Sequence, residues 1–212
     1  MSVHDLEEQE RIDAIKAWWK QHGNTVTLGV ALFAAVMAGI QGWRWYQQKQ
    51  NVEAAAVYQA VQAGAQGGDV KKIREAAGAI IEKYPSTSYA TRAALEAARA
   101  NFESGDTKSA KAQLQWVTEH ASEPQARDVA RLRLAGVLLD EKNYAEAVKL
   151  LDSKHDTAFD GLYADLKGDV MAAQGKTNEA RTAYQAALSK IDEKSAYRKF
   201  VELKLDGLGE AK

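Results

Sequence analysis

The sequence contains no cysteine and very little proline. Without cysteine there are no disulfide bonds, no thiol catalysis and no thiolate metal sites, although a disulfide-free domain can still fold in the periplasm. Pro85 and Pro124 are the only prolines, so few positions interrupt a helix. The β-branched residues do not alternate with polar ones, as half-buried strands would require. These absences, with abundant alanine, predict an all-α fold.

An excess of charge is also absent. The chain has 28 Lys and Arg against 29 Asp and Glu, which leaves a formal net charge of −1. No overall field therefore attracts the chain to nucleic acid or to acidic substrates, and we expect no nucleic-acid partner. A length of 212 residues, 46% of them hydrophobic, suits one compact domain with an appendage.

Motifs that carry chemistry are missing as well. The histidines His4, His22, His120 and His155 are scattered and do not pair at the spacing of a helical metal site. The glycine-rich stretch 64–68 lacks the lysine of a phosphate-binding loop, and no serine occupies a nucleophile elbow. We therefore expect neither enzymatic activity nor a metal or cofactor.

One long uncharged segment stands out. The stretch TVTLGVALFAAVMAGI, residues 25–40, carries no charge, and with the following residues it extends over 25–46. That length is close to the roughly 20 residues that cross a bilayer as a helix. Amphipathic aromatic residues at both ends match the headgroup regions of a membrane. These interface residues are Trp18, Trp19, Trp43, Trp45 and Tyr46.

Two alternatives to a transmembrane helix are a buried core helix and a cleaved signal peptide. Core helices are usually shorter and lack tryptophans at both ends, and the acidic residues before the segment are unlike a signal peptide. The positive residues before it are Arg11, Lys16 and Lys20, against Arg44 and Lys49 just after it. This small bias favours a cytoplasmic N-terminus.

The N-terminal tail, residues 1–24, predicts a short amphipathic helix. Leu6, Ile12, Ile15 and Trp19 recur at helical spacing, and we expect the sequence His22-Gly23-Asn24 to end this helix. The tail is a membrane-surface helix, a docking point for a cytoplasmic partner, or an ordinary solvated flank whose few apolar groups touch lipid headgroups. After the span, no breaker occurs before the glycines at 64–68, so the spanning helix should continue into the soluble domain.

The rest of the chain, residues 47–212, repeats one pattern. ESGDTKSAKAQLQWV, DEKNYAEAVKLLDSK and AQGKTNEARTAYQAAL share a turn, an alanine and a bulky residue in the same order. The alanines of this pattern are 37 and 33 residues apart, close to the ~34-residue period of tetratricopeptide (TPR) repeats. The predicted helix openings are Thr107, Tyr144 and Thr177, the close contacts Ala110, Ala147 and Ala180, and the bulky positions Leu114, Leu151 and Tyr184.

With an earlier pair that closes near Pro85, the chain predicts four helical hairpins. A final helix in SAYRKFVELKLDGLG should cap the stack, with Tyr197, Phe200, Val201 and Leu205 on its apolar side. The first helices of such hairpins usually present an inner face to a peptide or partner helix. The residues predicted on this partner-binding face are Arg92, Leu95, Arg99, Phe102, Leu132, Leu139, Asp165 and Asp169.

The chain resembles a known family in its acidic tail ending in IDAIKAWWKQHG, its span followed by GWRWYQ and its run YADLKGDVMAAQGKTNEARTAYQAAL. It is similar throughout to the YfgM family, the ancillary subunits of the bacterial SecYEG translocon. The resemblance implies an inner-membrane protein with a periplasmic TPR-like domain, which associates with the translocon and with the membrane-anchored periplasmic chaperone PpiD.

Two functions remain open at this point. The first is a scaffold that gathers a chaperone near secreted or membrane proteins as they emerge from the translocon. The second is an envelope-stress regulator, whose cytoplasmic tail sequesters a signalling protein such as a response regulator. Deletion of residues 2–20 separates them, because only the regulator needs the tail.

Overall fold

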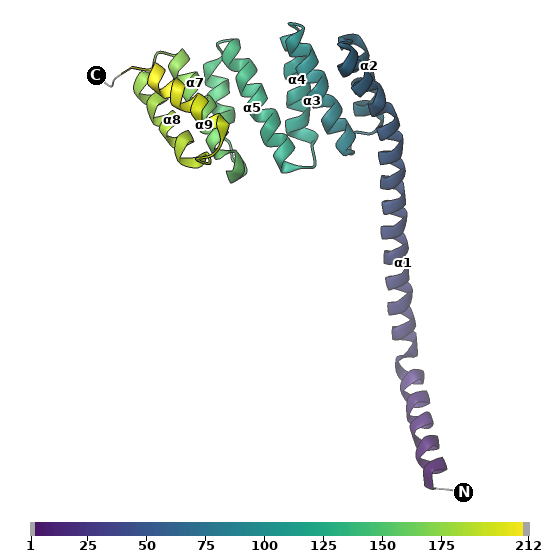
Figure 1. Ribbon diagram of the computed structural model, residues 1–212. Helices are drawn as coiled ribbons and strands as arrows, with labels where there is room; N and C mark the ends of the chain where they lie inside the picture. Colours follow the sequence, from purple (N-terminus) through teal and green to yellow (C-terminus); the bar gives the residue numbers. More distant parts are fainter. Residues whose placement is uncertain (1–2, 210–212) are drawn as a thin grey trace. The chain divides into compact units, whose positions relative to one another are not determined.

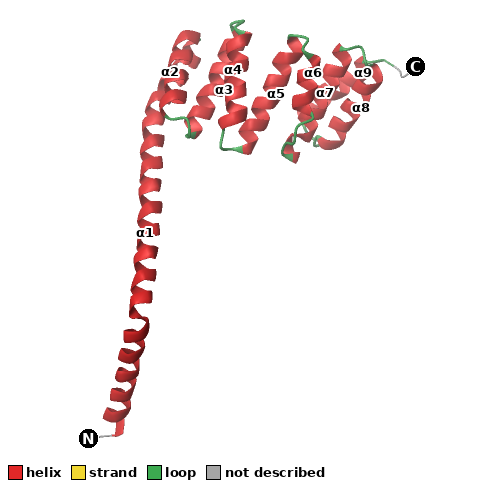
Figure 2. Ribbon diagram, turned by 180° about the vertical axis from the view of Figure 1, so that it is seen from behind, coloured by secondary structure: helices red, strands yellow, loops and turns green. Residues whose placement is uncertain are grey.

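The computed structural model describes the backbone of residues 3–209 and the side chains of residues 11–209. All regular elements in this part are helices, as predicted (Figures 1 and 2). The elements are α1 Val3–Gly67, α2 Val70–Lys83, α3 Ser88–Glu103, α4 Thr107–His120, α5 Pro124–Asp140, α6 Tyr144–Leu151, the 3-10 helix η1 Thr157–Phe159, α7 Asp160–Ala173, α8 Thr177–Lys190 and α9 Ala196–Gly207.

Helix α1 contributes to two compact units, one ending at Lys49 and one beginning at Gln50. The prediction that a helix ends at residues 22–24 is wrong, because α1 continues through them. An interior glycine costs only ~1 kcal/mol relative to alanine and does not end a helix by itself. A Cβ on Gly23 would come within 3.0 Å of the Trp19 indole, so the missing side chain makes room for that ring.

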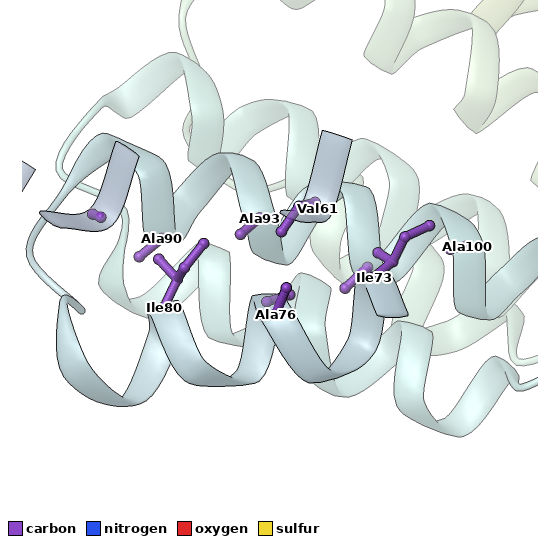
Figure 3. Packing of buried hydrophobic residues seen from close by; sticks show 10 residues of the cluster. Val61, Ile73, Ala76, Ile80, Ala90, Ala93 and Ala100 are labelled. Atoms are coloured by element: carbon purple, nitrogen blue, oxygen red, sulfur yellow. The ribbon is translucent and has the colours of Figure 1, made fainter. Parts of the chain in front are cut away.

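The last turns of α1 belong to the second unit. Ala54 and Val61 of α1 are buried against Ile73 and Ile80 of α2 and against alanines of α3 (Figure 3). Continuation of the helix beyond the apolar segment up to the glycine turn is confirmed. The turn itself contains Gly68 at a φ of 68°, a left-handed conformation that glycine adopts without steric cost.

The predicted repeat register is confirmed. Helices α4, α6 and α8 open at the predicted Thr107, Tyr144 and Thr177. The three alanines assigned to close contacts and the three residues assigned to the bulky positions are all buried. Gly105, Lys142 and Gly175 have positive φ at the same place in successive hairpins, since each helix pair needs the same tight turn.

Both views show the hairpins following one another in chain order, with α9 against the last hairpin, as a stack of hairpins requires (Figures 1 and 2). The hairpins are the end of α1 with α2, then α3 with α4, α5 with α6, and α7 with α8. Helix α2 ends just before Pro85, and α3 begins after Thr87, whose hydroxyl oxygen accepts a hydrogen bond from the Ala90 amide at 3.3 Å.

Helix α9 occupies the place of the first helix of a fifth hairpin. Val201 is fully buried against the last hairpin, and Leu205 packs against the same cluster. The prediction that Phe200 shares this apolar side is wrong, because the side chain is 62% exposed. Phe200 directly precedes the buried Val201, and neighbouring helical residues point about 100° apart.

Candidate protein-binding site

A groove of about 610 Å³ lies between the first helices of the second, third and fourth hairpins. We call it the α3–α5–α7 groove. The buried side chains of Leu114 and Val137 line its depth. Its other large side chains are the apolar Phe102, Leu139 and Leu166 and the charged Arg99, Arg133 and Asp140.

Three of the residues predicted on the inner face line this groove. They are Arg99 and Phe102 of α3 and Leu139 of α5. Arg133 and Leu166 were missed, although the turn residues could have revealed them. Both lie nine residues before the left-handed residue of their hairpin, at Lys142 and Gly175, and so hold equivalent positions on α5 and α7.

The groove combines an apolar centre with charge. Arg99 Nε donates a hydrogen bond to Glu103 Oε1 at 2.8 Å, so this arginine is already paired. Arg133 and Asp140 form no ion pair or side-chain hydrogen bond with another described residue. They are seven residues apart on α5, which places them on one side of the helix about two turns apart. A partner could pair with both.

Leu95, Leu132 and Arg92 lie outside the groove. Leu95 and Leu132 are half-buried and pack against the cores between successive hairpins. Arg92 is exposed, and its guanidinium carbon lies 5.9 Å from the centre of the Tyr89 ring. Leu95 and Leu132 therefore contribute to the packing between helices, whereas the Arg92 side chain is accessible to solvent.

The prediction that Asp165 lies on an open face is wrong, because α9 covers it. Its carboxylate accepts a hydrogen bond from the Tyr197 hydroxyl at 2.5 Å and from Lys204 Nζ at 2.8 Å. Asp169 accepts hydrogen bonds from Lys204 Nζ at 2.7 Å and from the Tyr184 hydroxyl at 2.8 Å. A buried carboxylate such as that of Asp165 is stable only when it is paired in this way. Through Lys204, both aspartates attach the cap to the stack.

The tyrosines and the lysine of this network have shifted pKa values. Burial, followed by the hydrogen bond to Asp165, raises the pKa of Tyr197, and burial with Asp169 does the same for Tyr184. Burial alone would lower the pKa of Lys204, but hydrogen bonds to both aspartates outweigh it and raise this pKa. At neutral pH a neutral Tyr197 and a charged Lys204 therefore hold α9 against α7, while a neutral Tyr184 joins α8 to α7.

The predicted interface aromatics are exposed on α1. Trp18, Trp19, Trp43, Trp45 and Tyr46 all have accessible rings in the unit that ends at Lys49. One helix among the described residues is long and apolar enough to cross a membrane, and almost none of its most apolar window is buried within the protein. An apolar, unpacked helix of this kind suits a lipid environment.

The described residues contain no group of three or more histidine, aspartate or glutamate side chains that could hold a metal ion. His22 and His120 each place Nδ1 within hydrogen-bonding distance of the carbonyl oxygen four residues earlier. His155 stacks on Tyr163, with ring centroids 3.8 Å apart. His4 lies outside the described side chains.

Comparison with known proteins agrees with this architecture. The family model of a tetratricopeptide repeat-like domain matches residues 16–210. A protein of Neisseria gonorrhoeae named "Ancillary SecYEG translocon subunit" is 34% identical over 98% of this chain and 100% of its own length.

Two further relatives carry the same name. The protein of Escherichia coli is 26% identical over 95% of this chain and 96% of its own length. The protein of Haemophilus influenzae is 26% identical over 87% of this chain and 90% of its own length. The match extends over the apolar segment as well as the hairpins, so the chain belongs to the YfgM family of ancillary SecYEG translocon subunits.

Proposed function

We propose that this protein is a membrane-anchored scaffold at the Sec translocon, which binds other proteins and performs no catalysis. The observation that carries the proposal is the full-length similarity to relatives named as ancillary SecYEG translocon subunits. The α3–α5–α7 groove supports it, because an apolar centre flanked by charges suits reversible contact with a protein segment.

The proposed topology is a single-pass inner-membrane protein. Residues 1–24 form the cytoplasmic tail, 25–46 the transmembrane helix and 47–212 the periplasmic domain. The exposed apolar surface of α1 supports the membrane segment. The three positive residues before the segment, against two after it, favour a cytoplasmic N-terminus.

Within this function, we assign partner binding to the groove. Phe102, Leu139 and Leu166 would supply apolar anchors, while Arg133 and Asp140 would fix the direction of the bound segment. We propose a periplasmic chaperone such as PpiD as one partner and emerging secreted or membrane proteins as the clients of the pair. Arg92, which is exposed on α3 outside the groove, would add a contact at the edge of the inner face.

Affinity purification of the full chain from membranes in mild detergent tests the proposal. We expect translocon subunits and a periplasmic chaperone to be recovered, and we expect Phe102→Ala to reduce the recovery of the chaperone. Gln185→Ala is the matched control, because Gln185 is exposed on α8 outside the groove. Recovery of neither partner by the unsubstituted chain would overturn the proposal.

The competing function, a regulator acting through the cytoplasmic tail, predicts a different result. Ile12 and Ile15 are exposed on α1, so the tail has apolar side chains that a signalling protein could contact. Deletion of residues 2–20 should leave chaperone recovery unchanged if the protein is a scaffold. A loss of signalling output with the hairpins still folded would favour the regulator.

A further inference from the structure

The outward side of α9 carries an apolar stripe formed by Ala196, Phe200, Leu203 and Gly207. These residues are spaced four, three and four positions apart, which aligns them along one side of a helix. Phe200 and Leu203 are 62% and 68% exposed, the highest values for large apolar side chains in α2–α9. A capping helix normally presents a polar outer face, so this stripe needs an explanation.

The repeat register shows what kind of surface the stripe adjoins. Leu95, Leu132 and Asp165 each lie ten residues before a left-handed turn residue. Leu95 and Leu132 pack against core clusters that include residues of the next hairpin, and Asp165 accepts a hydrogen bond from Lys204 of the cap. The equivalent residue of α9 is Lys199, ten residues before the left-handed Gly209. Lys199 and the stripe beside it therefore occupy a stacking surface that no described residue covers.

The charges on this surface would complement those on a second, antiparallel copy of the same surface. Lys199 lies toward the beginning of α9 and Asp206 toward its end, and neither forms an ion pair with another described residue. If two copies of α9 meet in antiparallel orientation, Lys199 of each copy comes beside Asp206 of the other. In the same arrangement Phe200 faces Leu203, and the small Ala196 faces Gly207, which lets the helix ends approach closely.

We propose that α9 is a self-association surface, at which two copies of this chain join end to end through a twofold antiparallel helix pair. Each copy covers the stripe that the other leaves exposed. A contact between two helices of this length buries less than the ~1,200–2,000 Å² of a standard stable interface. The pairing is therefore weak in dilute solution, and anchoring of both copies in one membrane strengthens it by raising their local concentration.

Disulfide trapping tests the proposal cleanly, because the natural chain has no cysteine. The variant Ala196→Cys/Gly207→Cys should form a covalent dimer on mild oxidation of membranes that contain the full chain. The two positions are eleven residues apart, roughly 16 Å along one helix, so they cannot join within a single copy. Each single variant should give no dimer, because an antiparallel pair places position 196 opposite 207 and not opposite itself.

Three further variants probe the contact itself. In the double-cysteine background, Leu203→Asp should lower the dimer yield at least ~10-fold, because pairing would bury an unpaired carboxylate. Lys199→Glu should lower the yield, and Lys199→Glu combined with Asp206→Lys should restore it. Because Leu203, Lys199 and Asp206 are exposed, we expect unchanged melting temperatures for all three variants. A melt run beside the trapping separates lost pairing from lost folding.

Absence of a double-cysteine dimer would overturn the proposal. Equal dimer yields from the single and double variants would also overturn it, since they would indicate random collision. Cross-linking only to a different protein would show that a partner, and not a second copy, covers the stripe. These results are independent of the proposed role at the translocon, because trapping reports on this chain alone.

Discussion

Replacement of Lys204 by methionine should loosen the attachment of α9 to the last hairpin. The Lys204 ammonium donates three hydrogen bonds, at 2.8 and 3.0 Å to Asp165 and at 2.7 Å to Asp169. Methionine keeps much of the volume but leaves two neighbouring carboxylates without their cation. The tyrosine hydroxyls of Tyr184 and Tyr197 then remain as their side-chain partners.

The size of the effect follows from burial. Breaking a fully buried ion pair costs ~3–5 kcal/mol, whereas an exposed pair contributes only ~0–1 kcal/mol. The Asp165 side chain is 3% exposed but that of Lys204 is 35% exposed, so solvent offsets part of the loss. We expect Lys204→Met to lower the free energy of unfolding by ~2–3 kcal/mol, or the melting temperature by ~4–12 °C for a domain of this size.

Thermal melts of the full chain in mild detergent, followed by circular dichroism, measure this change. Lys194→Met is the control, because this exposed lysine forms no side-chain ion pair or hydrogen bond within the described residues, and its melt should match that of the natural chain. If the two variants melted at the same temperature, the network of Lys204 would not hold the cap, and the reasoning would be refuted.

The same network predicts a loss of stability in alkali. The pKa values of Tyr184, Tyr197 and Lys204 are all raised in the folded protein. A raised folded-state pKa stabilises the fold below the ordinary pKa, and this contribution is lost as the pH rises above it. The melting temperature should therefore fall above about pH 10, where the unfolded chain begins to release these protons. Tyr197→Phe should flatten this dependence, and a slope equal to that of the natural chain would contradict the assignment.

Three substitutions test other parts of the structure. Gly168→Ala should destabilise the last hairpin by ~1–3 kcal/mol in a melt, because the new Cβ would lie 2.4 Å from the Tyr184 ring. Ala147→Leu should lower the free energy of unfolding by a similar ~1–3 kcal/mol, because the larger side chain overpacks a close helix contact. Phe102→Ala in the groove should change the melting temperature by only a few degrees. A large loss of stability for Phe102→Ala with none for Ala147→Leu would mean that the repeat register is wrong. Ala35→Asp should prevent membrane integration, because a carboxylate at the centre of the span costs ~2.5–3.5 kcal/mol, which is about the favourable insertion free energy of the whole span. If the variant stayed in the membrane pellet after carbonate extraction, the span would insert more strongly than this value implies.

The hairpins could be predicted because their sequence signals are local. Ala110, Ala147 and Ala180 recur where helices must approach closely, and such a position accepts few other residues. The turns at Gly105 and Gly175 repeat with the same spacing. Each of these signals reflects a steric requirement within one hairpin, so a single sequence is sufficient to show it.

The burial and contacts of the α7 aspartates could not be predicted from local sequence signals of this kind. The position of Asp165 in the repeat is the one held by Leu95 and Leu132, which predicts contact with a neighbouring element but not which one. Its burial depends on Tyr197 and Lys204, which lie 32 and 39 residues further along the chain. The docking angle of α9 decides these contacts, and local periodicity does not encode that angle.

The prediction that the tail helix ends near Gly23 was wrong because contacts that form only in the folded helix decide the outcome. Glycine commonly follows the end of a helix, but it is also tolerated inside one when a neighbour uses the space. Here the Trp19 indole lies beside Gly23, and the Thr27 hydroxyl donates a hydrogen bond to the Gly23 carbonyl oxygen at 2.7 Å. Both contacts arise only once the helix has formed, so the sequence pattern alone favoured the wrong alternative.

Site-specific photo-cross-linking in native membranes tests the proposed scaffold most directly. A photoreactive residue at position 102 would lie in the α3–α5–α7 groove, and one at position 185 would lie on α8 outside it. We predict that position 102 captures a periplasmic chaperone or a translocon subunit and that position 185 captures neither. Capture from position 185 with none from position 102 would contradict the groove as the binding site, and failure of both positions to capture a Sec component or a chaperone would contradict the scaffold itself.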